Sequence, residues 1–281
     1  MVTFTNQATL SYNGTVINSN ITTGELRRVL TVTKTAVIDT YTQDSQVTYV
    51  VSIVNTGTAA VTDLTITDDL GAYDFNGTTL VPLEYVSGSV TYFVNGVLQP
   101  DPAVVSGPPL VIQGIDVPAG GVVSVIYVAQ VNQFAPPVTD GTITNTVLVT
   151  GACAAEASET ITARDEAELT ITKSLCPTTV TCGGTLTYTF VIQNTGNAPV
   201  VATDNAVVTD TFDPALTDIA VTFNGAAWTA PANYTYNEAT GEFATAIGQI
   251  TVPAATYTQD PVTGVWTTQP GVSTLTVTGT L

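Results

Sequence analysis

The chain has 281 residues, enough for two domains of common size, and only 10% of them are charged, against roughly 25% in an average soluble domain. Its formal charge of −18 excludes nucleic acid and anionic lipid as partners, and no apolar run reaches the ~20 residues of a membrane span. Because the chain has no histidine, it has no Ser-His-Asp triad and no histidine metal ligand, so we expect no metal, no cofactor and no enzyme activity.

Residues 4–12 alternate polar and apolar side chains, which is the pattern of a half-buried strand. Asn13 and Gly14 follow as a strong hairpin signal, because a tight primed turn needs positive backbone angles that both residues tolerate. The sequence therefore predicts an N-terminal β-hairpin in residues 1–22, with its second strand near residues 15–21. A linker is expected in residues 23–29.

Residues 30–57 recur as residues 169–196 with a constant offset of 139 (169 minus 30) and no gap. Each copy holds a Leu-Thr-x-Thr-Lys strand, a loop, a second alternating strand and an Asn-Thr-Gly turn. Short strands separated by turn signals, in blocks of about 120 residues, predict an immunoglobulin-like β-sandwich in each repeat. We therefore expect an all-β fold with two tandem sandwiches, in residues 30–163 and 169–281, and a linker in residues 164–168.

The N-terminal stretch belongs to the same repeat pattern, since residues 4–10 match residues 143–149 at the same offset. A third copy is due after the second repeat, where the sequence stops at Leu281. The second sandwich is therefore expected to lack two adjacent strands, which leaves backbone groups without partners and an apolar groove open.

We expect the N-terminal hairpin of a neighbouring subunit to fill this gap by strand donation. Donor and acceptor lie in different parts of one subunit, so the contact propagates into a head-to-tail homopolymer unless it closes into a ring. A closed swapped dimer and a frayed arm are the alternatives. The donor side chains expected on one face are Phe4, Asn6, Ala8, Leu10 and Tyr12.

Both lysines of the chain occupy the same repeat position, on the apolar face of their strand by alternation. One aspartate and one asparagine per repeat are also expected to point inward. A buried lysine, acid and asparagine are the set that a self-forming isopeptide bond requires, because burial would make the amine neutral and nucleophilic and keep the acid protonated. The candidates are Lys34, Asp68 and Asn145 within the first repeat, and Lys173, Asp210 and Asn6 between subunits. An unreacted buried ion pair is the alternative.

Cys176 and Cys182 are candidates for a disulfide across a loop between two strands, with free thiols as the alternative. Such a bridge would indicate an oxidising destination. Cys153 would then be left free or paired with another chain.

The succession of Leu-Thr-Val-Thr-Lys34, Asn-Thr-Gly57, Thr-Asp68, Val-Pro118 and Thr-Asn145 resembles the conserved domain of unknown function number eleven, a repeat of bacterial and archaeal surface proteins. The lysine, acid and asparagine set is similar to that of B-type collagen-adhesin pilin domains. The resemblance implies immunoglobulin-like modules on a cell or spore surface.

The leading hypothesis is a structural subunit of an extracellular or spore-surface fibre that assembles by strand donation. The alternative is a surface adhesin or ligand-binding module, in which aromatic residues near 73–75 and 92–93, together with Trp228 and Trp266, would bind sugar or protein.

Overall fold

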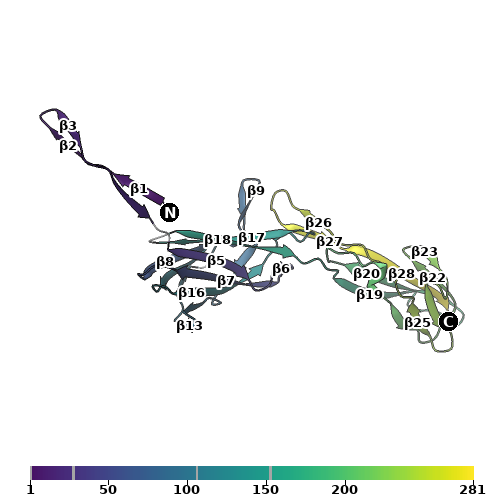
Figure 1. Cartoon of the computed structure of the whole chain (residues 1–281). Helices are drawn as coiled ribbons and strands as arrows, with labels where there is room; N and C mark the ends of the chain where they lie inside the picture. The colour runs from purple at the N-terminus through teal and green to yellow at the C-terminus, as the bar shows by residue number, and fades with distance from the viewer. Residues whose placement is uncertain (1, 27–28, 106, 152–153) are drawn as a thin grey trace. The chain divides into compact units, whose positions relative to one another are not determined.

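The computed structural model describes all residues except 1, 27–28, 106 and 152–153. The chain divides into two compact units, Met1–Asn132 with Ile143–Ile161 and Gln133–Thr142 with Thr162–Leu281 (Figure 1). The loop before residue 143 thus groups with the second unit, although residues 30–163 were predicted to form the first sandwich. Its contacts explain the difference, since the Trp266 backbone N–H donates to the Gln133 carbonyl and the Asn197 amide donates to the Pro137 carbonyl.

The first unit is a sandwich of two six-stranded antiparallel sheets. The order of one sheet is β13-β12-β16-β7-β5, with β11 also pairing β16. Its strands are β5 (Leu30–Ala36), β7 (Gln46–Asn55), β11 (Leu83–Tyr85), β12 (Thr91–Val94), β13 (Val97–Leu98) and β16 (Val122–Val131). The order of the other sheet is β14-β15-β8-β17-β18-β6. Its strands are β6 (Thr40–Tyr41), β8 (Val61–Asp68), β14 (Ala103–Val105), β15 (Leu110–Val117), β17 (Thr142–Thr150) and β18 (Ala155–Ala163).

Alternating side chains on the inner faces of these sheets form the core of the first unit. Every second residue of β7 and β16 is buried, as the period-two pattern predicted. Burying a large apolar side chain contributes roughly 1.5–3 kcal/mol, so these inner faces hold the sheets together. A short hairpin of β9 (Tyr73–Phe75) and β10 (Thr78–Leu80) connects to this sandwich.

The N-terminal residues form a hairpin in two sections. The section β1 (Val2–Asn6) pairs with β4 (Thr22–Leu26), and β2 (Thr9–Tyr12) pairs with β3 (Thr15–Asn18). Between the sections, the Ser19 hydroxyl accepts from the Ala8 backbone N–H and interrupts the regular ladder. The strand predicted in residues 4–12 is thus interrupted at residues 7–8, the returning chain is interrupted between Asn18 and Thr22, and the hairpin continues to Leu26, within the segment predicted to be a linker.

The second unit contains a five-stranded sheet of order β19-β20-β28-β22-β23 and a three-stranded sheet of order β21-β25-β24. The strands of the larger sheet are β19 (Leu169–Cys176), β20 (Thr185–Asn194), β22 (Thr217–Phe223), β23 (Ala226–Trp228) and β28 (Gly271–Thr280). The smaller sheet consists of β21 (Thr209–Thr211), β24 (Tyr234–Asn237) and β25 (Glu242–Thr245), and a separate hairpin consists of β26 (Thr256–Gln259) and β27 (Trp266–Gln269).

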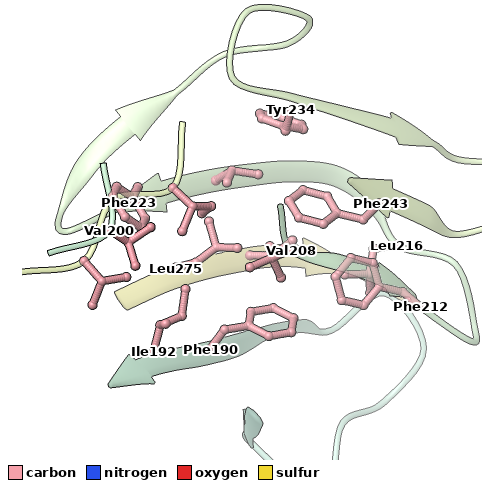
Figure 2. Packing of buried hydrophobic residues seen from close by; sticks show 14 of the residues in the cluster. Phe190, Ile192, Val200, Val208, Phe212, Leu216, Phe223, Tyr234, Phe243 and Leu275 are labelled. Carbon is pink, nitrogen blue, oxygen red and sulfur yellow. The ribbon is translucent and has the colours of Figure 1, made fainter. Parts of the chain in front are cut away.

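An aromatic cluster lies in the core of the second unit. Figure 2 shows Phe190, Phe212 and Phe243 among the aliphatic side chains that fill the space between strands. The Phe212 ring lies 4.9 Å from the Tyr188 ring and 5.9 Å from the Phe243 ring, within the range of favourable aromatic pairs. This packing gives the second unit a core of its own.

The two units share their local hydrogen bonding as well as their sequence. Lys34 lies opposite Val51 in the β5–β7 ladder, and Lys173 lies opposite Phe190 in the β19–β20 ladder, at the same offset. The buried Asn55 side-chain amide bonds backbone groups of its own turn and the Val117 and Pro118 carbonyls at the end of β15. The Asn194 amide likewise bonds its own turn and the Pro253 carbonyl in the second unit. The predicted duplication and all-β fold of two immunoglobulin-like sandwiches are confirmed.

The predicted turn at Asn13 and Gly14 is also confirmed, because both residues have positive φ. The Asn-Gly pairs at positions 76–77, 95–96 and 224–225 have the same backbone conformation. The described part of the chain has one short helix, the 3₁₀ turn η1 (Ala202–Asp204). None of the described helical segments is long and apolar enough to span a membrane.

Candidate functional site

The first unit brings Lys34, Asp68 and Asn145 together between its two sheets. Lys34 lies on β5 and Asp68 on β8, and the Lys34 Nζ atom is 2.6 Å from Asp68 Oδ2 across the sandwich. Asn145 lies on β17, where its neighbour Val147 is opposite Asp68 in the ladder. All three side chains are buried, on the faces that strand alternation indicates.

Tyr127 on β16 completes this site, and sequence reasoning missed it. Its hydroxyl donates to Asp68 Oδ2 at 2.6 Å and accepts from Asn145 Nδ2 at 3.1 Å. The alternation of β16 could have indicated that Tyr127 is buried. No sequence pattern indicates which residue of the facing sheet it meets, because that depends on how the two sheets pack.

Two further polar atoms of this site have no hydrogen bond among the described residues. They are Asn145 Oδ1 and the hydroxyl of Tyr49, a residue of β7 whose ring stacks on the Tyr127 ring at 5.5 Å. A buried carbonyl oxygen without a donor is costly, by about 1–3 kcal/mol. Among the described residues, the Asn145 side chain is thus held by the hydrogen bond from its nitrogen to the Tyr127 hydroxyl, and its oxygen accepts none.

Burial sets the electrostatics of the site. It lowers the pKa of Lys34, although the Asp68 carboxylate opposes that shift. Burial also raises the pKa of Tyr127 and Tyr49, so both phenols stay protonated near neutral pH. The Lys34 ammonium thus loses its proton more readily than an exposed lysine.

This arrangement suits amide formation between the lysine and the asparagine. A neutral Lys34 amine is a nucleophile, the Asn145 side-chain carbon is an electrophile, and Asp68 contacts the amine and can carry its proton. The other reading is a permanent buried ion pair, in which the Lys34 ammonium and Asp68 carboxylate satisfy each other.

The pKa of Lys34 predicts a pH dependence in a chain that cannot form the bond. The pKa of Lys34 is lower in the folded Asn145→Ala chain than in the unfolded one, so between these two pKa values the unfolded chain binds more protons. The stability of the variant therefore rises with pH from the folded-state pKa of Lys34 up to about 10. We expect a gain of up to ~1.4 kcal/mol per pH unit within that window. Urea unfolding at several pH values measures it, with Asn145→Ala/Lys34→Met as the control that should show no such gain. Equal slopes in the two variants would contradict the prediction.

The second unit contains the same ion pair in a more open setting. Lys173 Nζ bonds Asp210 Oδ2 across its two sheets, but 38% of the Lys173 side chain is exposed, against 0% for Lys34. The Lys173 ammonium lies 4.4 Å from the Tyr188 ring centroid and 5.3 Å from that of Phe212, which are cation–π distances. The structure gives this site no asparagine comparable to Asn145 among the described residues of the unit.

The two sites also differ in an aromatic residue. Tyr127 lies opposite Tyr49 in its ladder, and Val277 lies opposite Tyr188 in the second unit. Phe212 supplies the second ring instead, by stacking on Tyr188 at 4.9 Å. The second site therefore keeps the aromatic pair and lacks the second hydroxyl.

The strand that carries Lys173 is uncovered on its core face. Leu30 and Val32 of β5 are buried, whereas their counterparts Leu169 and Ile171 of β19 are 44% and 53% exposed. In the first unit, the facing sheet that includes β17 and β18 covers this face.

An edge of the smaller sheet is open at the same place. In the first unit β8 pairs with β15 on one side and β17 on the other. Its counterpart β21 pairs with β25, and no strand of the described chain takes the position of β17. The second unit thus presents a free strand edge beside an uncovered apolar face.

The N-terminal hairpin shows the complementary exposure. Ile143 and Val149 on β17 are buried, whereas their counterparts Phe4 and Leu10 are 59% and 63% exposed. The other predicted donor residues Asn6, Ala8 and Tyr12 are also exposed. Asn6 contacts neither Lys173 nor Asp210 in any hydrogen bond described for this single chain.

The predicted disulfide between Cys176 and Cys182 is not formed, and both thiols are free and exposed. The strand register gives the reason, because Thr187 lies opposite Cys176 while Cys182 lies in the turn beyond. Cys153 lies outside the described residues.

Aromatic residues proposed for ligand binding take part in packing. Tyr92 is buried and its hydroxyl donates to the Asp116 carbonyl. Trp228 stacks on Phe223 with ring centroids 4.8 Å apart, and the indole nitrogen of Trp266 is buried. No group of three or more metal-ligating side chains occurs among the residues that the structure describes.

No protein-family model matches the chain, and no curated protein matches it. Among solved structures, the chain is similar to the pilus backbone RrgB of Streptococcus pneumoniae, at 12% identity and a TM-score of 0.35 over 86% of this chain and 55% of that chain. The collagen-binding subdomain of the Enterococcus faecalis surface protein ACE matches 50% of this chain and 99% of its own length, at 10% identity and a TM-score of 0.30. The chain thus spans about half the length of the pilus backbone. Similarity at this level leaves function to be argued from the residues themselves.

Proposed function

We propose that the protein is a structural subunit of an extracellular, cell-surface or spore-surface fibre, and that it polymerises head to tail by donating its N-terminal hairpin to the second unit of a neighbouring copy. One observation carries the proposal: equivalent residues are buried in the first unit but exposed both in the hairpin and on the face of β19. The exposed face of the hairpin corresponds to the buried face of β17 in the first unit, and the exposed face of β19 corresponds to the buried face of β5.

The first unit supplies the expected register of the donated strand. Val147 lies opposite Asp68 and Val149 opposite Ile66 in the β17–β8 ladder. Carried over by repeat position, Ala8 of the donor lies opposite Asp210 and Leu10 opposite Val208. The donated strand then adds to the free edge of β21, and its apolar side chains cover Leu169 and Ile171.

The same register aims Asn6 of the donor at the site of Lys173, as Asn145 joins the site of Lys34 through Tyr127 and Asp68 in the first unit. Docking would bury the Lys173 and Asp210 pair and complete a second amide-forming site. Lys173 Nζ would attack Asn6 Cγ, and one ammonia would leave for each link formed. The first unit would form its own bond between Lys34 and Asn145 in the same way.

Because the donated and accepting surfaces are different, the contact is heterologous, and each added subunit presents a new acceptor. An open filament results unless the geometry closes a ring. Strand donation and cross-linking are separate steps in this proposal, so they can be tested separately.

A boiled, reducing denaturing gel of the assembled full-length protein tests both steps together with negative-stain images. We expect filaments that run as a ladder of multimers, in which the subunits of long polymers are lighter by about two ammonias each. Lys173→Ala should still form filaments in negative-stain images. On the denaturing gel these filaments should run as monomers, each of which has lost the one ammonia of the Lys34 to Asn145 bond.

Different results would remove different parts of the proposal. Filaments of the unaltered chain that run only as monomers would remove the link between subunits and keep strand donation. Monodisperse particles in the images would remove the fibre, and dimers alone would indicate a closed swap.

A further inference from the structure

We infer that the Tyr127 hydroxyl is a catalytic acid of amide formation in the first unit, passing a proton from Asp68 to the departing nitrogen of Asn145. This inference rests on the proposed bond between Lys34 and Asn145. Four polar groups form an unbroken chain from the attacking atom to the leaving atom: Lys34 Nζ to Asp68 Oδ2 at 2.6 Å, Asp68 Oδ2 to the Tyr127 hydroxyl at 2.6 Å, and that hydroxyl to Asn145 Nδ2 at 3.1 Å.

The geometry gives Asp68 no shorter route to the leaving group. One carboxylate oxygen, Oδ1, accepts the Leu70 backbone N–H at 3.0 Å, and the other faces both Lys34 and Tyr127. Among the described contacts, the Asn145 amide bonds the Tyr127 hydroxyl and makes no direct bond with Asp68. An acid that must protonate Nδ2 therefore reaches it through the phenol.

The reaction balances along this chain. The Lys34 ammonium first gives a proton to Asp68, and the neutral amine attacks Asn145 Cγ while the carbonyl electron pair moves to Oδ1. The Asn145 nitrogen, now tetrahedral, has a lone pair and takes the Tyr127 proton, and the phenol oxygen takes the proton of Asp68. As the Cγ–Nδ2 bond breaks, the carbonyl re-forms and Asp68 takes a proton from the new amide nitrogen. The products are the amide, ammonia and a protonated Asp68.

The ground-state hydrogen bond supports this direction of transfer. Asn145 Nδ2 donates to the phenol while the amide is planar, and the bond reverses once the nitrogen gains its lone pair. No rearrangement of side chains is needed, because the two atoms are already in contact.

Tyr127→Phe tests the inference, with Tyr92→Phe as a matched control. Each change removes one buried hydroxyl from the first unit, but the Tyr92 hydroxyl bonds the Asp116 backbone and lies outside the site. Both changes are made in full-length Lys173→Ala, in which only the bond to Lys34 can form. Timed samples of cell-free synthesis, analysed by intact mass and by the cross-linked peptide, follow the loss of one ammonia.

We expect Tyr127→Phe to slow the loss of ammonia roughly 10²-fold, which is the low end of general acid catalysis, and Tyr92→Phe to react at the rate of the parent. Circular dichroism of both variants checks that they fold. As a second measurement, difluorotyrosine at position 127 keeps the hydroxyl and makes the phenol more acidic, so it should change the rate, whereas the same residue at position 92 should not.

An unchanged rate in Tyr127→Phe, or equal slowing in the two phenylalanine variants, would overturn the inference. So would a rate that does not respond to fluorination at position 127. A parent chain that never loses ammonia would overturn the Lys34 to Asn145 bond itself, and this result is distinct from the others.

Discussion

Replacing Phe4 and Leu10 with aspartate is expected to abolish filaments. In the proposed complex both side chains pack into the core of the second unit, where their counterparts Ile143 and Val149 are buried in the first unit. Each lost burial costs roughly 1.5–3 kcal/mol, and two desolvated carboxylates cost more. Each subunit contact should therefore weaken by at least ~10²-fold, since about 1.4 kcal/mol is a factor of ten.

Thr5→Asp/Thr9→Asp is the matched control, because it adds the same charge to the opposite face of the proposed donated strand. The counterparts of these residues, Thr144 and Leu148, are exposed in the first unit. Sedimentation of the full-length chain at several concentrations measures the effect, with negative stain as a second readout. Filaments in the first variant, or their loss in both, would contradict donation in this register.

Asn145→Ala is expected to lower the free energy of unfolding by roughly 4–5 kcal/mol, because the bond to Lys34 closes a loop of ~100 residues and the unfolded chain gains that freedom when the bond is lost. The chain-entropy estimate for disulfides applies, since any covalent link restricts the unfolded ensemble in the same way. Chemical denaturation measures the difference, and the intact mass reports whether one ammonia has been retained.

Lys34→Met supplies the comparison, since it removes the nucleophile in place of the electrophile. Both variants should retain their full mass at this site and lose a similar amount of stability. If Asn145→Ala lost much less than the estimate while the unaltered chain kept all its ammonia, the buried Lys34 and Asp68 ion pair would be the correct reading.

Strand alternation predicted the face on which each polar residue lies but could not predict what covers that face. Lys34 and Lys173 have similar neighbours in sequence and the same register, yet the first is buried and the second is partly exposed. The difference arises from strands elsewhere in the chain, which period-two reasoning does not include. Which strands cover a given face depends on the tertiary structure. Only the comparison of the two repeats indicated which strands cover the face of β5 and are missing over the face of β19.

Tyr127, the fourth residue of the first site, also shows that alternation predicts burial but not contacts. Tyr127 sits in an alternating strand whose burial was predictable, but its contacts to Asp68 and Asn145 depend on how two sheets face each other. The disulfide prediction was wrong for a related reason, because the spacing of Cys176 and Cys182 does not fix the register of β19 against β20.

The placement of both lysines near the start of their repeats has a mechanical consequence. In a filament with both bonds, a pulling force enters one subunit at Asn6, follows the backbone to Lys34, crosses to Asn145, and follows the backbone to Lys173 before it passes to the next Asn6. Residues 35–144 and those after residue 173 lie outside this covalent path. Tension would therefore run through two backbone segments per subunit, residues 6–34 and 145–173, which include most of β17 and all of β18. The strands between residues 35 and 144 would carry no covalent load, so the filament would resist extension without relying on their stability.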